Sequence, residues 1–138
     1  MNLADALLAA DAGQVTKKER KEYEVKRLSG ILGSPFVLEL KQIPNKRVRE
    51  IQDFSMKING RDMSVDQYEL SMGLLCDGIA NKDFDNRDVL KHYGVATRKE
   101  LFDVLFNAGE IQDIANVISD LCGFNNKKTE EQVDEVKN

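Results

Sequence analysis

The sequence predicts an α+β fold that is mostly α-helical, with an N-terminal β-hairpin packed on a bundle of about four to five short helices. Two observations predict it. Apolar and polar residues alternate within residues 23–40, as in strands, whereas apolar residues recur every three or four positions over residues 45–122, as in amphipathic helices. The clearest helical face consists of Ile111, Ile114, Ala115, Ile118, Leu121 and Cys122.

Length and composition place the chain among ordinary globular proteins. Its 138 residues suit one domain, with 41% hydrophobic and 32% charged residues. No apolar run approaches the roughly 18 residues that a membrane-spanning helix requires. Asp5 and Asp11 stand where a secretory signal would carry positive charge, so we expect a cytoplasmic location. Cys76 and Cys122, which lie far apart in apolar stripes, are expected to be reduced core thiols.

The composition changes along the chain and predicts three parts. Residues 1–21 form an N-terminal arm, in which Leu3, Leu7 and Leu8 favour a short helix. Such a helix is marginal in water by itself, so the arm is either a docking segment, for a partner or a neighbouring copy, or a frayed terminus. Residues 22–124 form a single globular domain. Residues 125–138 form a charged tail that we expect to be disordered.

The β-hairpin is predicted between Tyr23 and Leu40. Tyr23, Val25 and Arg27 alternate with their neighbours, and so do Phe36, Leu38 and Leu40. Glycine, serine and proline interrupt the pattern between the two strands. An isolated hairpin is barely stable in water, so we expect its apolar face to lie on the helices that follow.

Two helices are predicted in the middle of the chain. The first begins after Pro44, has an apolar face formed by Val48, Ile51, Phe54 and Ile58, and stops at the turn pair Asn59 and Gly60. The second follows Ser64, which has capping-box spacing with Gln67. Its apolar stripe consists of Val65, Tyr68, Met72, Leu75, Cys76 and Ile79. Gly73 and Gly78 within this helix indicate either close approach of another helix or a tolerated weakness.

Three shorter helices complete the predicted domain. Asp85 is positioned to cap a helical turn with Val89 and Leu90, and Thr97 with Glu100 has capping-box spacing before the next helix. Gly109 is expected to break that helix. Gly123 stands where a left-handed residue would end the last one.

The distribution of charge leaves one alternative function open. Residues 16–61 carry a net charge of +6, from twelve basic and six acidic residues, whereas residues 62–138 carry −8, from eight and sixteen. The helical half therefore repels nucleic acid. The alternative is a small helical regulator or adaptor that binds nucleic acid through residues 17–27, although Tyr23 is the only aromatic residue there on which a base could stack.

The sequence does not favour an enzyme. His92 is the only histidine, and near a predicted helix end it is better placed to satisfy terminal carbonyls than to transfer protons. One histidine and two distant cysteines cannot assemble a zinc site, and the glycines form no phosphate-binding motif. We therefore predict no catalytic, cofactor-binding or metal-binding residues.

The order of motifs resembles a known family. A hairpin is followed by a charged helix, a "xxYxLxxxLLxxGI" helix, a "Dxxx(L)xxxYG" turn and a "LxxxLFxxGEIxxIxxxIxxLCGF" ending. This pattern resembles the XkdN-like tail assembly chaperones of contractile-tailed phages and prophages of Gram-positive bacteria, over about residues 22–124. The most specific positions are Tyr93, Gly94, Leu101, Leu105, Gly109, Glu110, Ile111, Ile118, Gly123 and Phe124. Asn81 and Lys82 stand where the family pattern leads us to expect a proline, and the first 20 residues match no part of it.

The resemblance implies a non-catalytic protein that binds the tape measure protein. Such chaperones keep the apolar helices of this client soluble until tail tube subunits polymerise around it, and they are absent from the mature virion. The implied partners are the tape measure protein and also the tail tube protein. The resemblance implies no small-molecule substrate, no membrane and no cofactor. Whether the protein forms a homo-oligomer stays open. A chaperone of apolar helices needs apolar surface of its own. The candidate contacts are Leu101, Phe102, Leu105, Phe106 and Phe124, each of which could instead be an ordinary core residue.

Overall fold

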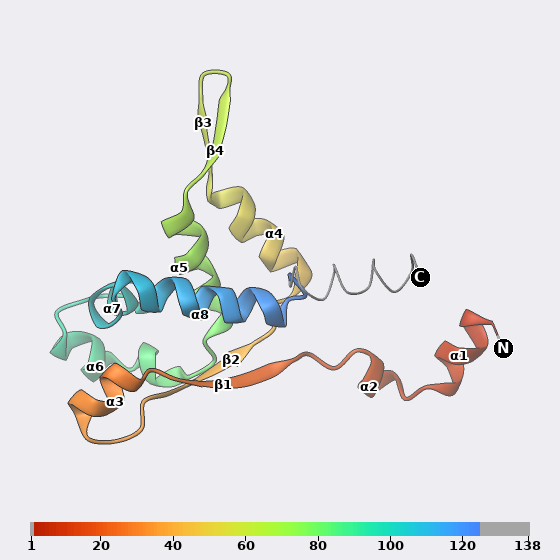
Figure 1. The fold of residues 1–138 in the computed structure, drawn as a ribbon, viewed down its shortest axis with the longest axis horizontal. Coiled ribbons are helices and arrows are strands. Elements are labelled where there is room, and N and C mark those ends of the chain that lie inside the picture. Colours follow the sequence, from red (N-terminus) through yellow and green to blue (C-terminus); the bar gives the residue numbers. More distant parts are fainter. Residues whose placement is uncertain (1, 125–138) are drawn as a thin grey trace, which may run out of the picture.

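A computed structural model describes residues 2–124 and confirms the α+β, mostly helical class (Figure 1). Two small antiparallel sheets of two strands each accompany the helices. The predicted tail, residues 125–138, lies outside the described residues. The elements in chain order are α1 (Leu3–Ala9), α2 (Ala12–Val15), β1 (Arg20–Glu24), α3 (Lys26–Leu32), β2 (Val37–Lys41), α4 (Asn45–Phe54), β3 (Met56–Asn59), β4 (Asp62–Val65), α5 (Gln67–Gly78), the 3-10 turn η1 (Lys82–Asp85), α6 (Arg87–His92), α7 (Arg98–Leu105) and α8 (Ala108–Leu121).

The predicted N-terminal hairpin is present, with one correction. Strands β1 and β2 pair antiparallel with Tyr23 opposite Leu38, and the side chain of Leu38 is fully buried. The prediction that Val25 and Arg27 continue the first strand is wrong, because the chain turns into helix α3 after Glu24. Gly33, at φ +71°, ends this helix in the left-handed conformation that glycine adopts without strain. The connection between the strands is therefore helical.

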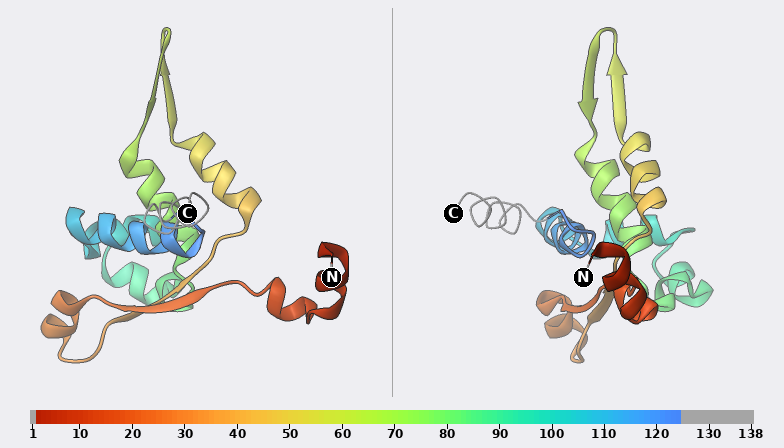
Figure 2. Two further views of the ribbon diagram at one scale, coloured as in Figure 1. Left: turned by 45° about the vertical axis from the view of Figure 1, so that its right-hand side comes forward. Right: turned by 90° about the vertical axis from the view of Figure 1, so that its right-hand side faces the viewer.

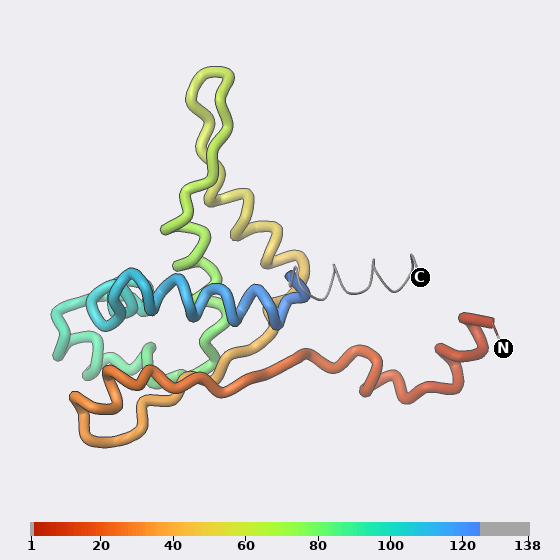
Figure 3. The backbone as a smooth tube through the Cα atoms, viewed as in Figure 1, coloured from red at the N-terminus to blue at the C-terminus, as the bar shows by residue number. Residues whose placement is uncertain are grey.

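Helix α5 is the centre of the fold and packs on α4, α7 and α8 (Figures 1 and 3). Its two glycines mark the closest approaches. A Cβ atom at Gly73 would lie 2.6 Å from Cγ2 of Ile51 in α4, and one at Gly78 would lie 2.6 Å from Cδ1 of Ile118 in α8. Real Cβ atoms do not come this close to a neighbour, so close helix packing is the correct interpretation of both glycines.

A second hairpin, β3–β4, replaces part of two predicted helices. Helix α4 ends at Phe54, so the prediction that Ile58 belongs to it is wrong, and Ser64 lies in β4 and does not cap α5. Asp66 caps α5 instead, and its carboxylate accepts the backbone N–H of Glu69 at 3.1 Å. Gly60 begins the two-residue loop with φ +66°. This hairpin projects from the body as a two-stranded ribbon (Figures 1 and 2).

The C-terminal helices begin at polar caps, and the prediction misplaced one cap and one helix break. The side chain of Thr97 accepts the N–H of Glu100 at 3.2 Å, as predicted. Asn86, and not Asp85, caps α6. Asn107 and Glu110 form the capping box of α8, so the break before this helix falls ahead of Gly109, which lies in its first turn. Gly123, at φ +95°, is left-handed as predicted.

The N-terminal arm, here residues 2–19, stands apart from the body (Figures 1 and 2). It contains α1 and α2, and all of its residues are exposed. The tube in Figure 3 shows how the arm continues directly into β1. The backbone N–H of Glu19 donates to the side chain of Gln42 at 3.1 Å, which joins the end of the arm to the body.

Candidate partner-binding surface

The structure separates the five residues that were predicted to contact a partner. Leu101, Phe102 and Phe106 are buried, with no more than 4% of each side chain exposed. Leu105 is half-buried, and Phe124 is 57% exposed. The three buried residues belong to the core and offer no surface in this conformation. A partner contact by Leu105 and Phe124 stays a prediction.

Aromatic packing explains why α7 is apolar over so much of its circumference. The ring of Phe102 lies edge-on to that of Phe84, with 5.1 Å between centroids, and stacks on that of Phe106 at 5.6 Å. Phe36 contacts Phe84 and Phe106 from the side of the N-terminal hairpin. The buried residues of α7, Leu101 and Phe102, therefore fill the interior of the domain.

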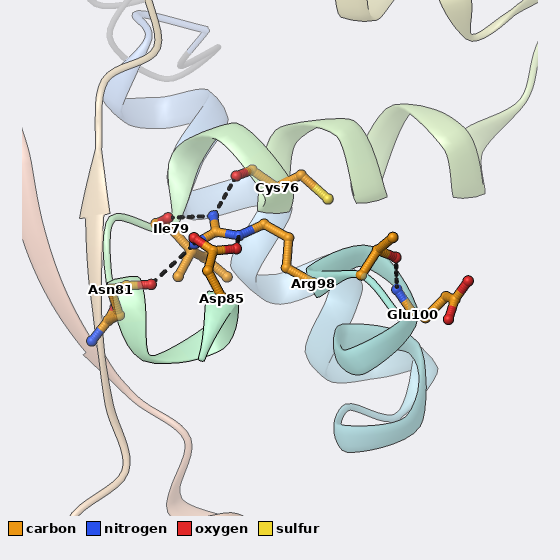
Figure 4. A network of polar contacts seen from close by, with 7 residues as sticks. Cys76, Ile79, Asn81, Asp85, Arg98 and Glu100 are labelled. Carbon is orange, nitrogen blue, oxygen red and sulfur yellow. Dashed lines mark hydrogen bonds and ion pairs between the residues drawn. The ribbon is translucent and has the colours of Figure 1, made fainter. Parts of the chain in front are cut away.

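Arg98 holds the start of α7 against the end of α5 (Figure 4). Its guanidinium donates to the backbone carbonyls of Cys76 at 2.6 Å, Ile79 at 2.9 Å and Asn81 at 3.0 Å. Two further bonds reach the carboxylate of Asp85. A planar, five-donor group suits this arrangement, because the last carbonyls of a helix lack partners within the helix. Arg98 therefore has a structural role.

Asn81, which stands where the family pattern predicts a proline, joins the end of α5 to strand β2. Its side-chain oxygen accepts the N–H of Glu39 at 2.7 Å, and its side-chain nitrogen donates to the carbonyl of Val37 at 3.2 Å. A proline could make neither bond, since it has no side-chain donor or acceptor.

An apolar groove opens between α4 and α5 beside the start of α7. Its volume is about 430 Å³. Its apolar lining includes Phe54, which is 76% exposed at the rim. Ion pairs border the groove: Lys99 Nζ lies 2.8 Å from Glu69 Oε2, and Arg47 contacts both Glu50 and Asp77. The residues that line it are Arg47, Glu50, Ile51, Phe54, Glu69, Met72, Gly73, Cys76 and Lys99.

The β3–β4 hairpin has one wholly apolar face. Its register pairs Met56 with Val65 and Ile58 with Met63. Directly opposite residues point to the same side of a sheet, so these four side chains share one face, here called the ribbon face. Ile58 is 73% exposed and Met63 is 63% exposed. The other face carries only polar residues, which are Lys57, Asn59, Asp62 and Ser64.

Sequence reasoning missed the ribbon face, although a signal for it was present. An Asn-Gly pair stands between two short stretches in which apolar and polar residues alternate, and this is the strongest short-range indication of a hairpin. The four-residue spacing between Phe54 and Ile58 also fits a helix. For this reason Ile58 was assigned to the helix that begins after Pro44, although it lies in β3.

A family model described as the phage XkdN-like tail assembly chaperone protein matches residues 4–137. The chain belongs to this family of tail assembly chaperones. The resemblance in the sequence is thereby confirmed, and the match extends into the arm. A crystal structure of the protein YqbN, a structural genomics target, has a TM-score of 0.54 and 19% sequence identity over 78% of this chain and 88% of that chain. This likeness shows a shared fold. No curated protein matches.

The basic segment of this tail assembly chaperone, residues 17–27, ends in a residue that is already paired. The guanidinium of Arg27 makes two bonds to the carboxylate of Glu110, at 2.8 and 3.0 Å, and a third to the carbonyl of Leu105 at 2.7 Å. Hydrogen bonding to Arg27 lowers the pKa of Glu110, and the same bond raises the pKa of Arg27. Arg27 therefore fixes the N-terminal hairpin to α8.

Two side chains of the chaperone, Tyr68 and Cys76, hold their protons more tightly than usual. Burial, followed by the hydrogen bond to Asp103, raises the pKa of Tyr68 to about 12. Burial also raises the pKa of the Cys76 thiol, which keeps it protonated. Within residues 2–124, no three His, Cys, Asp or Glu side chains gather as a metal site, and no helix is long and apolar enough to cross a membrane.

Proposed function

We propose that this chaperone binds the tape measure protein and keeps it soluble until tail tube subunits polymerise around it. The chaperone acts by binding alone, with no catalytic step and no cofactor. It takes place in the cytoplasm of the bacterial host, and the chaperone is absent from the mature virion. The tail tube protein is the second partner, since its polymerisation displaces the chaperone from the client.

The ribbon face is the observation that carries this proposal. Its four apolar side chains, Met56, Ile58, Met63 and Val65, lie on a projecting hairpin and are each at least 38% exposed. Exposed apolar area gains free energy when a partner covers it. Two of the four are methionines, whose flexible thioether side chains adapt to different apolar surfaces. A client with many similar apolar helices suits such a surface.

The mode of binding follows from the shape of the hairpin. Both outer edges of the hairpin carry backbone groups without a strand partner. We nevertheless expect a partner to bind the apolar face, because covering it removes apolar surface from water. An amphipathic client helix laid across Ile58 and Met63 would bury both side chains and leave the polar face of the hairpin in water. The contact is small, so each copy binds weakly and releases readily when tail tube subunits compete.

Co-expression with a tape measure fragment tests the proposal. The soluble yield of the fragment is measured with the wild-type chaperone and with the double variant Ile58→Glu/Met63→Glu. We expect the wild type to raise the yield several-fold and the variant to lose most of that gain, because two carboxylates on the ribbon face oppose apolar contact.

The matched control places the same two charges on the polar face, in the variant Asn59→Glu/Ser64→Glu. It has the same net charge as the test variant and should retain the solubilising effect. Equal loss in both variants would assign the effect to charge or stability. No gain in soluble fragment with the wild-type chaperone would reject the proposed function.

A further inference from the structure

The outer edge of strand β2 is closed by the chain that follows α5. In an antiparallel pair, alternate residues point their backbone groups away from the partner strand. On β2 these residues include Val37 and Glu39. The N–H of Ala80 donates to the carbonyl of Glu39 at 2.8 Å. The side chain of Asn81 accepts the N–H of Glu39 and donates to the carbonyl of Val37. No further strand can therefore add to β2.

The outer edge of strand β1 is open. The N–H of Val25 donates to the carbonyl of Phe36, so the odd-numbered residues of β1 bond to β2. The outward backbone groups belong to Arg20, Glu22 and Glu24, and within residues 2–124 none of these groups has a hydrogen-bond partner. All three residues are exposed. An open edge of this kind can pair with another strand.

The exposed face of this sheet places like charges directly opposite each other. Arg20 lies opposite Lys41, and Glu22 lies opposite Glu39. None of the four makes an ion pair with another described residue. Like charges directly opposite each other destabilise a sheet. The pattern is therefore unfavourable within one chain, and a partner strand that supplies the opposite charges would compensate for it.

A second copy of β1 supplies those opposite charges. Every second residue of this segment alternates in one order, two basic and then two acidic: Lys18, Arg20, Glu22 and Glu24. Two such strands can pair antiparallel with Lys21 on the two-fold axis. Lys18 of each copy then lies opposite Glu24 of the other, and Arg20 lies opposite Glu22. A shift of two residues either way would place Arg20 opposite Arg20, or Glu22 opposite Glu22.

We propose that two copies of the chaperone associate through their β1 strands in this register, and so form one four-stranded antiparallel sheet in the order β2–β1–β1–β2. The hydroxyl of Ser29 donates to Oε2 of Glu24 at 2.8 Å, which leaves Oε1 for Lys18 of the other copy. The two Lys21 side chains meet at the axis, where Glu19 of each copy lies diagonally next to Lys21 of the other. The ribbon face lies away from β1, so this contact does not depend on the client (Figure 1).

The same pairing brings two exposed apolar segments to one place. Figure 1 shows the arm and α3 at opposite ends of β1. Because the two strands run in opposite directions, the arm of each copy lies at the same end of the sheet as α3 of the other. Val15 in the arm is 56% exposed, and Ile31 and Leu32 in α3 are 68% and 54% exposed. Contact between these segments adds apolar burial to the strand pairing.

Sedimentation equilibrium of the full chain over a wide range of concentrations is the first test. One pair of strands is a small interface, so association is weak and depends on concentration. The average mass should rise from the 15.6 kDa of one chain toward twice that value, and less so at high salt. The ribbon-face variant Ile58→Glu/Met63→Glu should associate like the wild type. A wild type that stays at the mass of one chain, or a rise that the ribbon-face variant removes, would overturn the proposal.

Charge reversal tests the partner and the register together. Arg20→Glu and Glu22→Arg each place like charges at both Arg20–Glu22 contacts, and we expect each to weaken self-association by about tenfold. In an equimolar mixture of the two variants opposite charges face each other again, so the mixture should associate like the wild type. Single variants that associate normally, or a mixture that does not recover association, would overturn the proposal.

Thermal unfolding of the same variants separates this role from a structural one. Within one chain, Arg20→Glu faces Lys41 and Glu22→Arg faces Glu39, so each variant replaces a pair of like charges by a pair of opposite charges. At concentrations where the wild type is a single chain, both variants should be at least as stable as the wild type. Lower stability in both would contradict the charge pattern on which the proposal rests.

Cross-linking at the two-fold axis is the last test, in a protein that carries Cys76→Ser and Cys122→Ser. The two copies of position 21 form a pair without mutual backbone hydrogen bonds, with Cα atoms about 4.5 Å apart, which is within reach of a disulfide. We expect Lys21→Cys to form a disulfide between copies on oxidation far faster than the control Lys17→Cys, whose two copies lie roughly 26 Å apart along the strands. Equal rates would mean random collision and overturn the proposal.

Discussion

Arg98 and Asp85 form a two-point ion pair, with Nε 2.9 Å from Oδ1 and Nη2 3.0 Å from Oδ2. The pair is the exposed part of a larger cluster, because the same guanidinium also binds three backbone carbonyls at the end of α5 (Figure 4). The side chain of Asp85 is 58% exposed and that of Arg98 is 19% exposed. The carbonyl bonds are therefore the more important part for stability, since exposed ion pairs contribute little.

The first prediction concerns Arg98. Replacing it by alanine leaves three carbonyls without their donor, and we expect a loss of about 3 kcal/mol in the free energy of unfolding. Asp85→Asn keeps the carbonyl bonds and should cost less than about 1 kcal/mol. Urea denaturation measures both values. Equal losses in the two variants would show that the ion pair, and not the carbonyl cluster, holds α7 to α5.

The second prediction concerns Gly78. A Cβ atom at this position would lie 2.6 Å from Ile118, so Gly78→Ala should destabilise the fold by about 1–3 kcal/mol. Gly30→Ala is the matched control: its helix α3 has open space there, and alanine should stabilise by about 0.5–1 kcal/mol. Adding Ile118→Val to Gly78→Ala should recover part of the loss in thermal unfolding. A neutral Gly78→Ala variant would contradict the close approach of α5 and α8.

The sequence predicts the fold class and the larger elements, but not where the chain leaves a helix for a strand. Apolar periodicity locates α5 and α8 because each presents one long buried stripe. Apolar periodicity fails between Phe54 and Val65, because strands β3 and β4 have only four residues each, which is too few to show a clear period. The four-residue spacing from Phe54 to Ile58 fits a helix as well as a strand. Local turn chemistry at Asn59 and Gly60 was the better guide there.

The candidate site shows a different limit of sequence reasoning. An apolar helix face can contact a partner or pack against its own chain, and the face of α7 that carries Leu101 and Phe102 packs against its own chain. Phe102 and Phe106 pack against aromatic residues from η1 and from the loop before β2, which are distant in sequence. Ile58 and Val65, which are exposed on the surface, were assigned to the apolar faces of helices that do not extend so far.

The third prediction concerns the capping box of α8. The side chain of Asn107 accepts the N–H of Glu110 at 2.9 Å, and the side chain of Glu110 accepts the N–H of Asn107 at 2.9 Å. Asn107→Ala should cost about 1 kcal/mol, because an orphan donor at the start of the helix loses its acceptor. Asn116→Ala, in the exposed middle of α8, should change stability by less than about 0.5 kcal/mol. Similar values for both variants would exclude a capping role.

The fourth prediction concerns the pH dependence of stability that Arg27 confers on Glu110. Hydrogen bonding to Arg27 lowers the pKa of Glu110 in the folded state. A lowered folded pKa means that the unfolded chain binds the proton more readily, so the stabilisation is complete above the ordinary glutamate pKa of about 4.3. It decreases as the pH falls below that value toward the folded pKa.

The measurement compares the wild type with Glu110→Gln by urea denaturation from neutral pH into the acid range. The stability difference between the two should be constant near neutrality and shrink below the ordinary glutamate pKa. Arg27→Gln removes the partner and should abolish most of this pH dependence, because Glu110 then keeps only its bond to the backbone of Asn107. A difference that grows as the pH falls would have the wrong sign and would rule out the ion pair as its source.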